Sequence, residues 1–196
     1  MDDLLLKEKL MRLLRSADET NVALGFEIAK GHPLIDLEAF KRSYLPLWKH
    51  LMGENISTVE PVHMAALNQP TLDLSHKDIT YVPPEIGILT NLRKLQLFVN
   101  KVSVLPKEIA HLKKLYWLGL AGNKMKDFKA VASIPNLEWL SFAGNSLLQL
   151  PPEIENLKQL KEFNLRYNPI YPKEQAQIQG WLPNCVVHFS EFEESK

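Results

Sequence analysis

Apolar positions recur with a nearly constant period between residues 69 and 170. Four segments fit the pattern L-x-x-L-x-L-x-x-N-x followed by an apolar residue, and their starts lie 23, 22 and 23 residues apart. These segments begin at Leu92, Leu115, Leu137 and Leu160. A weaker copy precedes them, in which Gln69 replaces the first leucine and Lys77 replaces the asparagine. The pattern therefore predicts about five tandem repeats with a divergent first copy.

Apolar and variable residues alternate at the start of each copy, and this alternation predicts a short strand. The fourth and sixth residues are apolar, which is the period of a strand with one buried face. The inward-facing pairs are Leu95 with Leu97, Leu118 with Leu120, Leu140 with Phe142, and Phe163 with Leu165. The asparagine of each copy falls where the chain must turn, and its side chain can pair with backbone groups there. We expect a buried ladder of Asn100, Asn123, Asn145 and Asn168.

The second half of most copies predicts a short helix on the outer side. The segments VPPEIGIL, LPKEIAHL and LPPEIENL contain a proline that fixes the turn and apolar residues at helical spacing, such as Ile86 and Leu89. The copy from Leu115 continues instead as DFKAVASI and is one residue shorter. Because one copy cannot bury its apolar face alone, neighbouring copies are expected to stack into a curved solenoid with a parallel concave sheet and short convex helices.

These repeats resemble the leucine-rich repeat family, in particular the 23-residue class whose second half reads L-P-x-E-I-x-x-L, typical of Ras-suppressor-like and many bacterial repeat proteins. The resemblance covers residues 69–170 and implies an α/β fold, a right-handed leucine-rich-repeat solenoid with an N-terminal α-helical cap and a C-terminal cap. It says little about function, since the family is defined by architecture and binds unrelated partners.

Residues 1–53 lack the repeat and predict three amphipathic helices. The segment SADE, which starts at Ser16, predicts a capping box that opens the second helix, and this helix ends near Gly31. The third helix must kink or restart at Pro46. We expect a bundle that caps the first repeat, and the alternative is a separate docking module with its own partner. Residues 54–68 form a connecting segment with one more helical turn.

Residues 171–196 predict a C-terminal cap followed by a tail. Pro172 suits the first turn of a helix, which would cover the last repeat with Ile178, Trp181 and Leu182. The segment VVHF is expected to add an edge strand, and the tail SEFEESK is expected to fray. We interpret Cys185, the single cysteine, as a buried structural thiol rather than a nucleophile.

Composition and charge disfavour several classes of partner. Lysine plus arginine (23) balances aspartate plus glutamate (23), so no net field draws the chain to nucleic acid or an anionic membrane. The amino-terminal residues MDDLLLKEKLMRLL place two acids where a secretory signal needs positive charge, and no apolar run approaches the roughly 20 residues needed to cross a bilayer. We expect a cytoplasmic protein without membrane insertion.

The sequence contains no catalytic pattern that we can identify. Its six histidines lack the close pairing of a zinc site, and neither a phosphate-binding G-x-x-x-x-G-K-S/T loop nor a G-x-S-x-G motif occurs. We therefore expect no enzyme activity, no metal and no cofactor.

Variable strand positions carry the remaining information about function, because they face the concave surface. The segments LYWLGLAGN and LEWLSFAGN place Trp117 beside Trp139 over a floor of glycine, alanine and serine, which predicts a shallow depression with an aromatic wall. Exposed aromatic residues with little central charge are typical of a binding site. The alternative is that the two tryptophans stack on one another or are covered by the chain itself. The candidate partner-binding residues are Trp117, Trp139, Phe98, Tyr167, Tyr116, Val99, Lys94 and Arg166.

The function predicted from these features is a non-catalytic module that binds a protein or peptide on its concave face. One alternative is a regulatory or scaffold subunit whose N-terminal helical bundle carries the specificity. A second is the recognition part of a larger effector system. Weak self-association through the aromatic residues is a further alternative.

Overall fold

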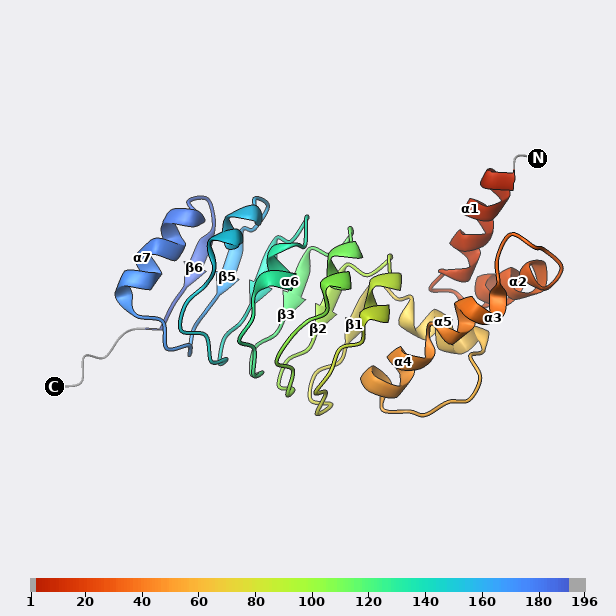
Figure 1. Ribbon diagram of the computed structural model, residues 1–196, viewed down its shortest axis with the longest axis horizontal. Coiled ribbons are helices and arrows are strands. Elements are labelled where there is room, and N and C mark those ends of the chain that lie inside the picture. Colours follow the sequence, from red (N-terminus) through yellow and green to blue (C-terminus); the bar gives the residue numbers. More distant parts are fainter. Residues whose placement is uncertain (1–2, 191–196) are drawn as a thin grey trace.

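A parallel sheet runs through most of the molecule. The computed structural model describes residues 3–190. Its strands are hydrogen-bonded in chain order as one sheet, and Figure 1 shows them following one another along the long axis. The strands are β1 (Thr71–Asp73), β2 (Lys94–Gln96), β3 (Trp117–Gly119), β4 (Trp139–Ser141), β5 (Glu162–Asn164) and β6 (Val186–His188). The first five belong to the predicted repeats, and β6 is the strand predicted in VVHF.

Short helical segments return the chain between successive strands. Three are 3-10 helices, η2 (Pro84–Ile88), η3 (Lys107–His111) and η4 (Pro152–Asn156), and a fourth, in the shorter copy, is the α-helix α6 (Lys129–Ala132). A proline precedes each 3-10 helix and fixes its entry. Gly87 allows η2 to lie close to η3, because a β-carbon there would approach the Glu108 carbonyl oxygen to 2.7 Å. Most of the predicted convex helices are thus single 3-10 turns.

The predicted asparagine ladder holds the turns after the strands. The Asn123 side chain donates to the carbonyl of Leu97 at 2.7 Å and to that of Leu120 at 3.0 Å, and it accepts from the Val102 amide at 3.0 Å. Each asparagine therefore joins its own repeat to the preceding one. The same pattern recurs at Asn100, Asn145 and Asn168.

Helices occupy the chain before the first strand (Figure 1). They are α1 (Asp3–Leu14), α2 (Glu19–Lys30), α3 (Leu37–Arg42), α4 (Leu45–Leu47), the π-helix η1 (Trp48–Met52) and α5 (Pro61–Leu67). The predicted restart at Pro46 is confirmed, since α4 begins beside it. The predicted capping box is wrong: Asp18 is the N-cap of α2, because its carboxylate accepts from the Asn21 amide at 2.9 Å, while Ser16 accepts from the Asp18 amide at 3.1 Å.

Hydrogen bonds tie these helices to one another and to the first repeats. The buried Asn68 accepts from the Tyr44 hydroxyl at 2.8 Å and donates to the Leu14 carbonyl at 3.2 Å. Asn91, one repeat further on, donates to the Arg15 carbonyl at 2.6 Å. The buried apolar side chains form one continuous cluster from Leu10 in α1 to Cys185.

The helix α7 (Pro172–Trp181) follows the last repeat and packs Ile178 into the core. The strand β6 then pairs in parallel with β5, so that Val187 lies opposite Phe163. The predicted frayed tail lies, apart from Ser190, outside the described residues.

Candidate functional site

Strand register places the predicted concave positions in rows across the sheet. The row at the first residue of each strand runs through Thr71, Lys94, Trp117, Trp139, Glu162 and Val186. A second row, two residues later, runs through Asp73, Gln96, Gly119, Ser141, Asn164 and His188. Residues at equivalent positions of the five repeats are therefore neighbours in space, and β6 adds one residue to each row.

Trp117 and Trp139 stack on one another in the first row, which is the arrangement expected from the sequence as the alternative to a partner site. Their ring centroids lie 4.1 Å apart and their planes differ by 2°. The ring of Phe98 meets Trp117 edge-on at 5.6 Å. All three side chains are half-buried. We call these residues, Phe98, Trp117 and Trp139, the aromatic surface.

The predicted small-residue floor is not open beside the tryptophans. A β-carbon at Gly119 would lie 2.4 Å from the Phe98 ring and 2.9 Å from the Trp117 ring, so both rings lie over this glycine. Ser141 is buried as well. Gly119, which was predicted to form part of a depression, instead makes room for the Phe98 ring. A hollow of about 290 Å³ lies on the other side of Trp117, lined also by Thr71, Lys94 and Gln96.

Backbone conformation, not binding, explains two other glycines of the predicted floor. The residue before each ladder position has a positive φ: 67° at Gly122 and 61° at Gly144. The equivalent Val99 and Tyr167 also have positive φ, 51° and 58°. Glycine adopts this left-handed conformation without the steric cost that a β-carbon adds. These glycines therefore recur because the turn favours them, and the recurrence of AGN is no evidence for a partner.

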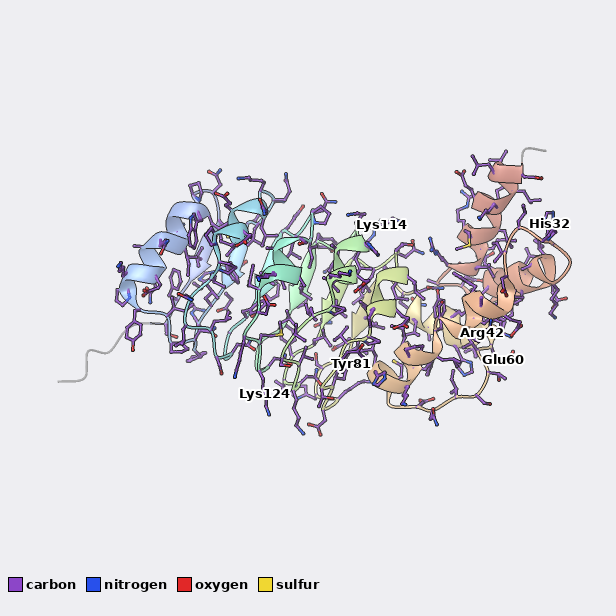
Figure 2. All side chains as sticks on the ribbon, in the orientation of Figure 1. His32, Arg42, Glu60, Tyr81, Lys114 and Lys124 are labelled. Carbon is purple, nitrogen blue, oxygen red and sulfur yellow. The ribbon has the colours of Figure 1, made fainter. Side chains whose placement is uncertain are left out.

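The remaining predicted site residues lie around the aromatic surface or beyond it. Lys94 Nζ lies 5.7 Å from the centre of the Tyr116 ring. Arg166 is exposed, and Tyr167 is 78% exposed at the carboxyl edge of the sheet, where its amide donates to Ser190 Oγ. Figure 2 labels one residue on each side of β3. Lys114 precedes the strand, and Lys124 follows it and lies on the opposite side of the solenoid, at the carboxyl edge of the sheet. The structure thus brings Lys94, Tyr116, Phe98 and the tryptophans together and leaves Val99, Arg166 and Tyr167 at the rim.

Sequence reasoning missed His188 as a residue of this face. In β6 it pairs in register with Asn164, and its Nε2 lies 3.3 Å from Glu162 Oε1. The alternation in VVH could have identified it, because an edge strand parallel to β5 continues the rows of the sheet.

Cys185 has the environment of a structural thiol. Its side chain is buried, and burial raises the pKa of the thiol to about 11, with a smaller contribution from Glu162. At neutral pH the thiol is protonated and weakly nucleophilic. Across residues 3–190, no cluster of three or more His, Cys, Asp or Glu side chains is placed to hold a metal ion. No helix in the same range is long and apolar enough to cross a membrane.

Comparisons with known proteins agree with the repeat architecture. Residues 136–157 match a model of the Leucine Rich Repeat family. No curated protein is significantly similar to the chain. A solved LRR protein from Leptospira interrogans is 42% identical over 57% of this chain, with a TM-score of 0.55, and 29% of its own length is covered. Internalin C2 from Listeria monocytogenes is 24% identical over 64% of this chain, with a TM-score of 0.51 and 55% of its length covered, which indicates a shared fold alone. The 23-residue class stays a prediction.

Proposed function

Since the tandem repeats of this chain are leucine-rich repeats, we propose that it is a non-catalytic interaction module that binds a protein or peptide on its concave face. The aromatic surface anchors this partner. The observation that carries the proposal is that Trp117 and Trp139, although stacked on one another, remain only half-buried near the middle of the sheet. Among the described residues, the ring contacts of this pair are with one another and with Phe98.

The physical properties of the stack suit a binding anchor. Each indole is held in place by its neighbours, so a partner that covers it restricts few further side-chain rotations. Large aromatic side chains near the centre of an interface contribute most of its binding free energy. Lys94 and Tyr116 lie beside the stack, and Val99, Arg166 and Tyr167 supply a rim of mixed chemistry.

Replacing both tryptophans by alanine tests the proposal. The double variant loses ring contacts worth about 0.5–1.5 kcal/mol for each aromatic pair, so some loss of stability is expected. Ile154→Val is the matched control, because it removes about 1 kcal/mol from the buried convex side without altering the concave face. Proteins captured by the wild-type chain and identified by mass spectrometry should be lost with the double variant and retained with Ile154→Val. Equal capture by all three proteins contradicts the proposal.

A second candidate function places the specificity in the N-terminal helices. A hollow of about 490 Å³ lies between α1 and the turn after η2, lined by apolar, basic and polar residues and by the acidic Glu8. The lining includes Leu4, Met11, Lys7, Arg12, Arg15 and Asn91. The variant Leu4→Ser alters this hollow at a residue that is 64% exposed, and Leu24→Ser on α2, 51% exposed, is its control. Capture that falls only for Leu4→Ser favours this candidate over the concave face.

Removing residues 1–53 is an unsuitable test of that second candidate. The deletion would strip Tyr44 from Asn68 and uncover apolar side chains of the continuous core. The shortened chain is expected to aggregate, so point variants are needed.

A further inference from the structure

The sheet gives Trp139 two different neighbours in its row. Trp117 stacks on one side of the indole. Glu162 is the register partner on the other side, one strand spacing or about 4.8 Å away along the sheet. Neither a second ring nor a cation within residues 3–190 lies against this outer face. An indole and a glutamate therefore occupy neighbouring positions of the row, and both attract positive charge.

The carboxylate of Glu162 keeps much of its negative charge available. Its side chain is 47% exposed, and its ion-pair partner is His188, at 3.3 Å, which offsets the charge only when the imidazole is protonated. Arg166 lies four positions later in the chain, beyond the end of β5, and does not pair with it. The neighbouring Glu138 is already bound to Lys161 at 2.7 Å.

The opposite side of the stack carries positive charge. Lys94 is the register partner of Trp117, and none of the ion pairs within residues 3–190 involves it. The row thus runs from an ammonium that contacts the Tyr116 ring but forms no ion pair with the described residues, through two stacked indoles, to a carboxylate. Lys94 and Glu162 are three strand spacings apart, which is about 14 Å.

From this row we infer the charge pattern of the partner, an inference that rests on the proposed function. The partner is an extended segment that stacks an arginine on the outer face of Trp139, pairs that arginine with Glu162, and places an acidic side chain at Lys94. Apolar residues of the segment cover the two indoles between these charges. An extended chain covers about 14 Å in four residues, so the acidic residue and the arginine are separated by about four positions. Arginine suits the site better than lysine because a planar guanidinium stacks on an indole while its edge pairs with a carboxylate.

Synthetic peptides and the full-length chain provide the test. The probe is acetyl-Gly-Glu-Ala-Leu-Ala-Arg-Gly-amide, and the comparison peptides replace Arg by Gln, Glu by Gln, or both. Binding is followed by NMR through the indole N–H signals of Trp117 and Trp139. The parent peptide should shift both signals and bind about tenfold more tightly than the peptide without arginine.

Substitutions in the protein assign each charge to its site. Glu162→Gln should weaken binding of the parent peptide several-fold and leave binding of the Arg-to-Gln peptide unchanged. Lys94→Gln should likewise weaken binding of the parent peptide and leave binding of the Glu-to-Gln peptide unchanged. Glu153→Gln, at an exposed convex position, is the control and should change neither affinity. The inference is overturned if all peptides bind equally or if the parent peptide does not bind. It is also overturned if the loss of affinity caused by a protein substitution is the same for the parent peptide and for the peptide that lacks the matching charge. If partner capture still depends on the tryptophans in that case, the proposed function survives; if capture is independent of them, the proposed function fails separately.

Discussion

The turn after each strand requires one residue with a positive φ, although most residue types disfavour that conformation. The position before the ladder asparagine, or before Lys77 in the first copy, is left-handed in every repeat, with φ of 58° at His76 and 51° at Val99. Two repeats meet this demand with glycine. Val99 does not, and a β-branched residue at positive φ stores backbone strain. This strained residue lies at the rim of the proposed binding face.

Replacing Val99 by glycine should stabilise the protein by about 1 kcal/mol, because the substitution removes the strain of the left-handed valine. Val104→Gly is the matched control, since Val104 has nearly the same exposure, 51% against 53%, and does not have a positive φ. The control should lose stability, because glycine there adds only unfolded-state entropy. Chemical denaturation of both variants measures the difference, and equal effects would show that Val99 is unstrained.

Elements are joined by side-chain amides that bind backbone groups of a neighbouring element. The asparagine ladder joins repeat to repeat, and Asn68, at the end of α5, does the same between α5 and the end of α1. The Tyr44 hydroxyl completes the Asn68 network. Burial raises the pKa of Tyr44 to about 12 from 10.0, with the Asn68 hydrogen bond acting in the opposite direction.

Alkaline unfolding tests this junction. The folded-state pKa of Tyr44 lies above the unfolded value, so its contribution to stability is full below pH 10 and is lost as pH rises through about 12. Tyr44→Phe should cost about 1–2 kcal/mol at pH 7, because Asn68 loses a buried partner, and should flatten the fall in stability above pH 10. Tyr81→Phe, at a 46% exposed position, is the control. A fall above pH 10 that is as steep in Tyr44→Phe as in the wild type would contradict the assignment.

The whole molecule shares one core despite its repeated construction. Because buried apolar side chains connect from Leu10 to Cys185, helices and repeats should lose their structure together. The solenoid then presents its concave sheet on a rigid frame, with the aromatic surface at its middle strands.

Urea unfolding followed by two probes tests this cooperativity. Far-UV circular dichroism reports mainly on the helices, and tryptophan fluorescence on the indoles spread along the chain. Their midpoints should coincide, and Leu10→Ala should lower both together by removing about 2–5 kcal/mol of stability. Leu24→Ala, on the exposed side of α2, should move neither. Two separated midpoints would show that the N-terminal helices unfold on their own.

The sequence determined the repeat, its strands and its ladder. A repeated pattern reports the same local environment several times, so Asn123 and its equivalents could be assigned without coordinates. The rows that place Trp117 beside Trp139 follow from the same periodicity, and their stacking is the alternative to a partner site that the sequence left open. The capping of α2 was harder, because Ser16 and Asp18 are both good N-caps and only the turn geometry distinguishes them.

Only the tertiary structure decided what covers the concave face. The chain pattern gives the order of residues along a strand, but the direction of the Phe98 ring depends on packing against Trp117 from the next repeat. That packing fills the space over Gly119. The approach of His188 to Glu162 likewise depends on a strand whose residues lie 24 positions further along the chain than their partners in β5. The local sequence pattern thus determined the solenoid of repeats, while contacts between side chains of different repeats determined the shape of its concave surface.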